Sequence, residues 1–292
     1  MQPLTRILVN TAGSGKTRLL LDGLCQRWGF YFIADERETG SEDFRRIVCE
    51  FTTYQDYERA KAMNKSDSKT QESIDHTQET AARALSQVLL SHFLLLGLLV
   101  DEVQALEEQK QLPWLQYRRL WVLIQVQSVE IFGWDLFLDL ARRLRPASHS
   151  DLQTRIRNKF EELSSQLKEG SFYCVLDEAQ VTTDKHYRDF FSENGSSSRP
   201  LLREIWRSWT TTFNVLEMRL ILAGTAIKED EMTSTLSSNA FKPANYAVKR
   251  DIGAFNDPGD QADYIRKYIP ADWTDLKWQE FLNRSWAWFR GR

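Results

Sequence analysis

The chain has 292 residues, of which 42% are hydrophobic and 12% aromatic, enough for one large or two small globular domains. Its 38 basic and 41 acidic residues give a net charge of −3, which argues against a broad nucleic-acid-binding face but leaves a local basic patch open. Three cysteines without close spacing (Cys25, Cys49 and Cys174) and four scattered histidines predict neither a disulfide framework nor a metal site, and favour a reduced, intracellular protein.

The first elements expected along the chain are a strand, a glycine-rich loop and a helix. Residues 7–9 form an apolar run, the sequence Asn-Thr-Ala-Gly-Ser-Gly-Lys-Thr follows over 10–17, and apolar residues recur at helical spacing over 17–28. A turn between a strand and a helix aims several backbone N–H groups at one point, and the helix N-terminus adds positive potential there. This order of elements favours a phosphate-binding loop.

Two side chains of this loop carry the expected chemistry. Lys16 can reach the β- and γ-phosphates of a nucleotide, and the Thr17 hydroxyl can bind Mg²⁺. Asn10 stands where the usual pattern has its first glycine, although the two glycines that follow still allow close approach of the backbone to phosphate. The residues expected to contact the phosphates are Ala12, Gly13, Ser14, Gly15, Lys16 and Thr17.

The middle of the chain is expected to be mostly helical. A strand at 30–34 leads to a mixed, helical stretch at 43–62 and then to a polar loop at 63–80, which feeds a long helix ending near Leu106. The elements expected after it are a strand at 120–126, an amphipathic helix at 131–144 and a second amphipathic helix at 151–167 that starts near Asp151 and ends at Gly170.

The long helix includes one stretch, 84–100, that is apolar enough to raise the question of a membrane span. A membrane helix needs about 20 apolar residues. This stretch carries Gln87, Ser91 and His92 and ends against an acidic pair. We therefore expect a buried core helix and no contact with a membrane. The first apolar segment of the chain is only as long as a strand, so no secretory signal is expected either.

A second motif lies well past the middle of the chain. The apolar run 172–176 is followed by the sequence Asp-Glu-Ala-Gln over 177–180, and a continuous apolar run is typical of a buried strand in a parallel sheet. Open α/β sheets bind ligands at the carboxyl ends of their strands, where this acidic pair would lie. We expect Asp177 to hold Mg²⁺ and Glu178 to orient the attacking water.

The last part of the chain is expected to alternate helices, loops and one further strand. A helix at 200–213 precedes a buried strand at 219–223 that ends in Gly224 and Thr225. Polar loops are expected at 192–198 and 229–245, and a tryptophan-rich helix at 273–289.

Alternating strands and helices predict an α/β protein with a doubly wound, mainly parallel sheet. Together with the two nucleotide motifs, this pattern favours a three-layer P-loop NTPase. We expect the core to span residues 1–270, with a large helical insertion at about 41–168 packed on one side of the sheet between the two nucleotide motifs. A C-terminal helix at 271–292 would begin a truncated lid, and the end at Arg292 suggests that the chain is a fragment followed by a further module.

The motifs at 13–17, 175–180 and 222–225 together resemble ATPase modules of the AAA+ and STAND kind. The closing segment, Trp-Ala-Trp-Phe-Arg-Gly-Arg over 286–292, resembles Crinkler-type proteins of fungi and oomycetes, in which a P-loop ATPase module precedes a nuclease-like module. The resemblance implies a role for Thr225, because a polar residue at that place touches the γ-phosphate or the lytic water; a simple turn at Gly224-Thr225 is the alternative. It also implies an intracellular effector or genome-conflict protein that acts in the cytoplasm or nucleus, of a host cell if it is an effector.

The expected function is Mg²⁺-dependent binding and hydrolysis of ATP that drives a conformational switch, with Lys16, Glu178 and Thr225 as catalytic residues and Thr17 and Asp177 as metal ligands. ATP is favoured over GTP because no guanine-reading motif is visible. Two alternatives stay open: a STAND-like module that holds a nucleotide with little turnover, and a helicase core. Arg219 and Arg250 are candidates for an arginine finger, while a protein partner, an oligomer and nucleic-acid binding remain open.

Overall fold

The computed structural model describes residues 5–9, 15–35, 40–46, 71–107, 114–168, 171–184, 190–191, 198–216, 218–225, 246–249, 257–266 and 275–289. Several of the expected features lie outside these residues: Ala12, Gly13 and Ser14 of the phosphate loop, Arg250, the loop at 229–245 and most of the stretch at 43–62.

The centre of the molecule is a five-stranded sheet in the order β2-β3-β6-β1-β7. All neighbouring pairs in it are parallel, as expected. The strands are β1 (Thr5–Val9), β2 (Gly29–Ile33), β3 (Tyr173–Asp177), β6 (Arg219–Gly224) and β7 (Tyr246–Lys249). A separate antiparallel pair joins β4 (Phe190–Phe191) to β5 (Ser198–Arg199). The expected α/β class with a mainly parallel sheet is therefore confirmed.

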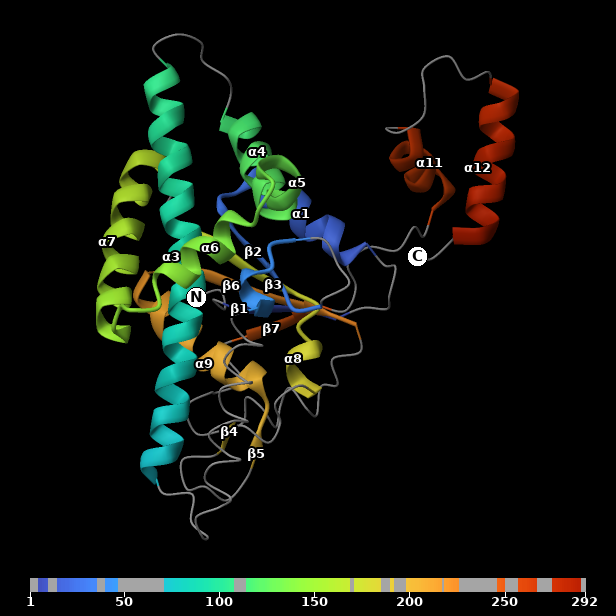
Figure 1. Ribbon diagram of the computed structural model, residues 1–292. Coiled ribbons are helices and arrows are strands. Elements are labelled where there is room, and N and C mark those ends of the chain that lie inside the picture. The colour runs from blue at the N-terminus through green and yellow to red at the C-terminus, as the bar shows by residue number, and fades with distance from the viewer. Residues whose placement is uncertain are drawn as a thin grey trace.

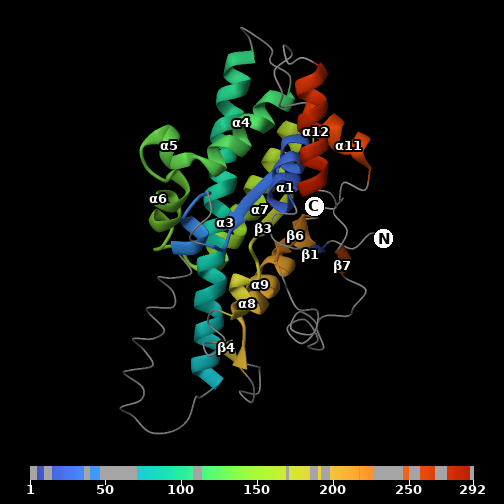
Figure 2. The ribbon, with the colours of Figure 1, turned by 90° about the vertical axis from the view of Figure 1, so that its right-hand side faces the viewer.

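Helices cover both faces of the sheet, an arrangement compatible with the expected three layers (Figures 1 and 2). Alternate side chains of β2 show the two faces: Phe30 and Phe32 belong to the larger core on one face, and Tyr31 and Ile33 to the smaller core on the other. The helices are α1 (Lys16–Gln26), α3 (Gln71–Glu107), α4 (Trp114–Val126), α5 (Ser128–Phe132), α6 (Leu136–Arg143), α7 (His149–Leu167), α8 (Val181–Asp184), α9 (Leu201–Leu216), α11 (Pro258–Arg266) and α12 (Asp275–Phe289).

Residues 120–126 form the end of helix α4, so the expected strand there is wrong. Trp121 and Gln125, one helical turn apart, are both buried against β2. The Trp121 indole N–H donates to the carbonyl of Gly29 at 2.8 Å, and Gln125 Oε1 accepts the N–H of Tyr31 at 2.9 Å. In this way α4 lies along the outer edge of β2 and satisfies backbone groups that no other described strand pairs.

The helical insertion is not confined to one side of the sheet, contrary to expectation. Helices α3, α6 and α7 contribute to the larger core, together with α9. Helix α4 also contacts α1, and Val122 packs in the smaller core with Leu20 and Leu24. The insertion therefore wraps around the β2 edge and reaches both faces.

Three expected boundaries are also wrong. Residues 131–144 form two helices, because Gly133 adopts the left-handed φ of 81° and Asp135 starts α6 by accepting the N–H groups of Phe137 and Leu138. Helix α7 begins at His149, two residues before its expected start, and is capped by Ser148. Residues 71–80, expected as loop, are the first turns of α3. Strand β7 and helix α11 were not predicted.

The helix expected from 84–100 is part of α3, which runs through the larger core. By length and composition, His76–Ala105 could cross a membrane, but 67% of its most apolar window is buried inside the protein. That burial agrees with a core helix. At the other end of the chain, α11 contacts α12, and the Arg18 guanidinium of α1 lies 5.0 Å from the ring centre of Tyr264 on α11.

A buried polar cluster lies within the larger core, and the sequence did not predict it. We call it the Asp43 cluster; its members are Ser41, Asp43, His92, Gln125 and Asp135. His92 Nε2 lies 2.9 Å from Asp43 Oδ2, and the Ser41 hydroxyl donates to Asp43 Oδ1 at 2.8 Å. The cluster joins residues 40–46, which follow β2, to α3, α4 and the start of α6.

Candidate functional site

Helix α1 begins where the glycine-rich loop ends. Gly15 precedes the helix with a left-handed φ of 80°, a conformation that glycine adopts without strain, and its carbonyl accepts the N–H of Leu19 at 2.9 Å. Lys16 and Thr17 are the first two helical residues, so their side chains lie in the positive potential of the helix N-terminus.

The Lys16 side chain is held in an unusually buried place for a lysine. It is only 5% exposed. Burial lowers the pKa of Lys16 below its ordinary value of 10.5, while the nearby carboxyl groups of Glu178 and Asp177 act in the opposite direction. A desolvated ammonium beside two carboxyl groups is suited to pair with an anion that enters between them.

Asp177 ends strand β3, and its side chain is fully buried. One carboxyl oxygen, Oδ2, accepts the Thr17 hydroxyl at 2.7 Å and the Tyr31 hydroxyl at 3.1 Å. The other, Oδ1, accepts the backbone N–H of Glu178 at 2.9 Å. Residues from α1, β2 and β3 are thus tied to one carboxyl group, which we call the Asp177 cluster (Thr17, Tyr31 and Asp177).

Glu178 turns away from the strand in a left-handed conformation, with φ of 53°, which is uncommon for a residue with a side chain. Its half-buried carboxyl group accepts hydrogen bonds from the Gln180 amide and, at 3.3 Å, from the Thr225 hydroxyl. Gln180 Oε1 in turn accepts the backbone N–H of Thr225 at 3.1 Å. Gln180 therefore connects the turn after β3 to the end of β6.

The sheet explains why these side chains meet. In the parallel register Val9 of β1 pairs with Gly224 of β6, and Ile33 of β2 pairs with Asp177 of β3. The carboxyl ends of four strands therefore lie along one edge, where α/β sheets bind ligands. Strand β6 lies between β1 and β3, which places Thr225 between the carboxyl end of β1 and the acidic pair.

The donor set fits Mg²⁺ bound together with a nucleotide better than a cation held by protein alone. Among the described residues there is no group of three or more His, Cys, Asp or Glu side chains that could hold a metal ion. Mg²⁺ commonly takes one or two protein oxygens and completes its shell with water and substrate phosphates. The Thr17 hydroxyl and the Asp177 carboxyl group are the oxygens available for this.

The structure thus brings together Lys16, Thr17, Asp177, Glu178 and Thr225, which the sequence had singled out. It separates Arg219 from them, because this residue begins β6 at the opposite edge of the sheet and lies over the ring of Tyr173. Arg219 is therefore not placed to act as an arginine finger on this site.

Two residues of the site were not predicted to have a role. Tyr31 lay within the expected strand, but nothing in the sequence linked it to Asp177. Only the pairing of β2 with β3, in which Ile33 lies opposite Asp177, brings Tyr31 close to that carboxyl group. Gln180 was noted as part of the acidic motif. Its amide group can donate and accept hydrogen bonds at the same time, and this chemistry could have indicated a role in the site.

Comparison of the chain with protein-family models, with curated proteins and with solved structures found no match. What the site does must therefore follow from its own geometry and chemistry.

Proposed function

We propose that the protein binds Mg²⁺-ATP at the carboxyl edge of its sheet and hydrolyses it to ADP and phosphate. The observation that carries this proposal is the hydrogen bond between the Thr17 hydroxyl and Asp177 Oδ2, 2.7 Å long and formed across 160 positions of the chain. It joins the helix that follows the glycine-rich loop to the acidic end of β3, as a nucleotide site of the P-loop type requires.

Each residue of the site makes a different contact with the nucleotide or the cation. Lys16 pairs with the β- and γ-phosphates, and the backbone N–H groups at the start of α1 add donors. Thr17 and Asp177 hold Mg²⁺, which offsets phosphate charge when bound. Tyr31 keeps Asp177 oriented through its hydroxyl group.

Hydrolysis requires a water molecule placed in line with the bond between the γ-phosphorus and the bridging oxygen. Glu178 accepts a hydrogen bond from that water and orients it; the new P–O bond forms as the bond to ADP breaks. Thr225 and Gln180 hold the Glu178 carboxyl group from the β6 side. The place of β6 between β1 and β3 supports the sensor role that the resemblance to AAA+ and STAND modules implies for Thr225.

The test is ATP turnover and nucleotide binding by the wild type and by two variants, Lys16→Ala and Glu178→Gln. We expect Lys16→Ala to lose binding, because the buried ammonium is its main charged contact with phosphate. We expect Glu178→Gln to keep binding and to lose about 100-fold or more in turnover, since an amide does not orient water as a carboxylate does. Lys277→Ala, which changes an exposed lysine on α12, is the control. Wild-type turnover by both site variants would refute the proposal.

A second candidate is a nucleotide-gated module with little turnover. The observation that favours it is the state of Glu178, which is engaged by both Gln180 and Thr225 and held at a positive φ. Both bonds are made to Oε2 and hold the carboxyl group in one orientation, so Glu178 can orient an attacking water only through Oε1 unless these bonds are released. ADP or ATP that copurifies with the protein, together with a turnover rate far below one per minute, would favour this module over an active hydrolase.

A further inference from the structure

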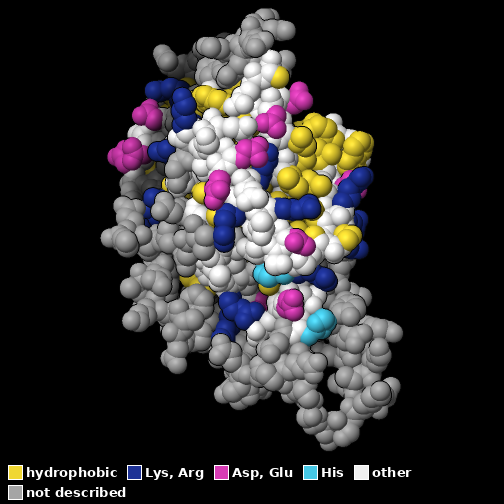
Figure 3. Space-filling view, turned by 90° about the vertical axis from the view of Figure 1, so that its left-hand side faces the viewer, with side chains coloured by type: hydrophobic (Ala, Val, Ile, Leu, Met, Phe, Trp, Pro, Cys, Tyr) yellow, Lys and Arg dark blue, Asp and Glu magenta, His cyan; other side chains and the backbone are white. Residues whose placement is uncertain are grey.

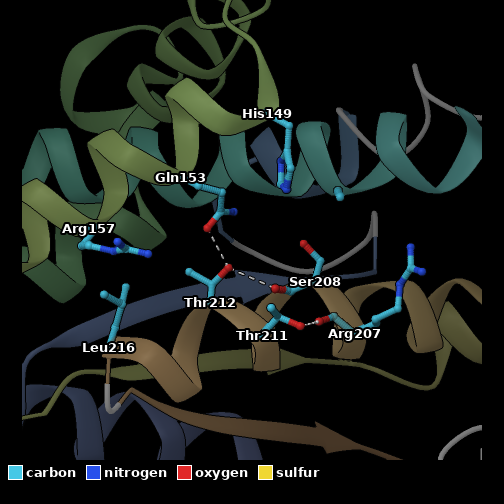
Figure 4. A pocket seen from close by; sticks show the side chains of 9 residues that line it. His149, Gln153, Arg157, Arg207, Ser208, Thr211, Thr212 and Leu216 are labelled. Carbon is cyan, nitrogen blue, oxygen red and sulfur yellow. Dashed lines mark hydrogen bonds between the residues drawn. The ribbon is translucent and has the colours of Figure 1, made fainter. Parts of the chain in front are cut away.

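A cavity lies on the other side of the sheet from helix α1. It has a volume of about 450 Å³ and lies between α3, α7 and α9, open to solvent on one side (Figure 4). These helices belong to the larger core, whereas α1 packs on the opposite face of the sheet. The cavity is therefore separate from the proposed nucleotide site, and its volume is in the range of small-molecule sites.

The side chains that line the cavity are mostly polar, and none of the nine is acidic. Arg157 points into it from α7, and Arg207 stands at the opposite end on α9, with Ser208 and Thr211 between them (Figure 4). Figure 3, which looks at the molecule from the side of α7, shows Lys, Arg and His side chains interspersed with Asp and Glu on this face. The lining itself offers two arginines and several hydroxyl groups to a ligand.

Arg207 is fixed in place, whereas Arg157 is not. The Arg207 guanidinium bonds to Glu204 at 2.9 Å and to Gln78 at 2.6 Å, which holds it at the end of the cavity. Across the described part of the chain, the exposed Arg157 guanidinium has no hydrogen bond or ion pair to another side chain. Its five donors are therefore free to bind a carboxylate or phosphate group.

Hydrogen bonds already hold several polar side chains at the base of the cavity. Gln153 donates to the Ser86 hydroxyl at 2.8 Å and accepts the Thr212 hydroxyl at 3.1 Å, so it links α7 to α3 and α9. Burial lowers the pKa of His149, although Glu79 opposes this, so the ring is mainly neutral at pH 7 and can donate or accept. A ligand would meet these groups without first having to order them.

We propose that this cavity binds a small organic anion whose phosphate or carboxylate group pairs with Arg157 and whose remainder lies over Ser208 and Thr211 towards Arg207. Phosphate and carboxylate groups both match the planar guanidinium group, because each offers two oxygens on one side. The ligand is therefore defined by an oxyanion of this kind. This proposal does not depend on the function proposed for the sheet edge.

Calorimetric titration with sodium phosphate and with citrate, at constant ionic strength, tests the proposal. It is done on the wild type and on Lys16→Ala, because anions could also bind at the glycine-rich turn. We expect saturable binding that persists in Lys16→Ala. Tighter binding of phosphate would assign a phosphate-bearing ligand, and tighter binding of citrate would assign a carboxylate ligand.

Two arginine variants locate the binding. We expect Arg157→Gln to weaken it about 10-fold or more, as loss of a charge-assisted hydrogen bond does, and Ser208→Ala to weaken it less. Arg155→Gln is the matched control, since Arg155 is exposed on the same helix and does not line the cavity. Absence of binding of both anions, or an equal loss in Arg155→Gln, would overturn the proposal.

Discussion

Strand β2 has a buried polar cluster on each of its faces, and the two clusters are built from similar groups. The Asp177 cluster joins a carboxyl group to the hydroxyls of Thr17 and Tyr31. The Asp43 cluster joins a carboxyl group to a hydroxyl and an imidazole, on the face where the rings of Phe30 and Phe32 contact His92. Each brings together residues far apart in the sequence.

The clusters differ in what surrounds them. Every member of the Asp43 cluster is at most 9% exposed, and its hydrogen bonds run between members or to the backbone of neighbouring segments. The Asp177 cluster lies beside Lys16 and the half-buried Glu178 and Thr225, at the edge of the sheet. Similar carboxyl–hydroxyl pairs can therefore hold secondary-structure elements together inside a core, or orient a carboxyl group at the edge of a sheet where a ligand could bind.

Tyr31 connects the two clusters. Its backbone N–H donates to Gln125, which also contacts His92 at 3.3 Å, and its hydroxyl donates to Asp177. The fully enclosed Asp43 cluster thereby fixes the strand from which the Asp177 cluster is oriented. If this distinction holds, changes in the Asp43 cluster should affect stability most, and changes in the Asp177 cluster should affect ligand binding most.

The largest effect on stability is expected for Asp43→Ala. This change leaves the buried His92 Nε2 without its acceptor, at a cost of about 1–3 kcal/mol, and removes one of two carboxyl acceptors of Ser41 Oγ, which keeps Asp135. We expect the free energy of unfolding to fall by about 2 kcal/mol or more, the cost of one orphaned buried group, measured by urea unfolding followed by circular dichroism. Asp139→Ala, which removes the partner of Arg143 on the surface, should cost less than about 1 kcal/mol. Equal losses would contradict the assigned role of the cluster.

The next effect is expected for Asp177→Asn, measured as the gain in stability on adding Mg²⁺-ATP. A ligand present at 100 times its dissociation constant stabilises the wild type by about 2.7 kcal/mol. The amide keeps an acceptor oxygen for Thr17 or Tyr31 but loses the negative charge that a divalent cation needs. We expect the variant without nucleotide to lose only about 1 kcal/mol and to lose the Mg²⁺-dependent gain. Retention of the full gain would show that Asp177 is not a metal ligand.

The elements that the sequence could predict are those whose pattern is local. Strands β1, β3 and β6 each contain a short continuous apolar run, and the polar residues at the end of β3 and directly after β6 mark the carboxyl edge before any pairing is known. Residues 120–126 carry a similar apolar run and were assigned to a strand, because a short run does not distinguish a strand from a buried helix. Only the contacts of Trp121 and Gln125 with β2 reveal the helix.

The clusters themselves could not be predicted, because they depend on long-range pairing. Tyr31 meets Asp177 across 146 positions, and His92 meets Asp43 across 49. No spacing rule links such residues before the strand order is fixed. Strand β7 was missed for another reason, since its short run Tyr-Ala-Val is not followed by a motif such as the glycine-rich sequence that marks β1.

A smaller effect is expected for Tyr31→Phe, which removes one hydroxyl from Asp177 and leaves the ring in place. We expect a loss of about 1 kcal/mol in stability, the usual net value of one hydrogen bond, and a several-fold rise in the Mg²⁺ concentration needed for nucleotide binding. Tyr117→Phe, in the larger core, is the control for the ring substitution and should leave the Mg²⁺ requirement unchanged. An unchanged requirement in Tyr31→Phe would mean that Thr17 and the Glu178 N–H orient Asp177 without Tyr31.

The smallest effect is expected for Lys16, and it tests whether this side chain stabilises the fold or serves to bind a ligand. Because burial lowers the pKa of Lys16 in the native state, folding disfavours its charged form, and this penalty is present in full below the native pKa. Between that pKa and the unfolded value of 10.5 the unfolded chain binds more protons, so the penalty falls as pH rises. In the absence of nucleotide, Lys16→Met should therefore be slightly more stable than the wild type at pH 7, and the difference should shrink towards pH 10. Urea unfolding of both proteins across this range measures it. A wild type that is more stable than Lys16→Met at pH 7 would show that the Lys16 ammonium stabilises the fold, as the Asp43 carboxyl group does. Lys16 would then have a structural role and not one confined to binding an anion.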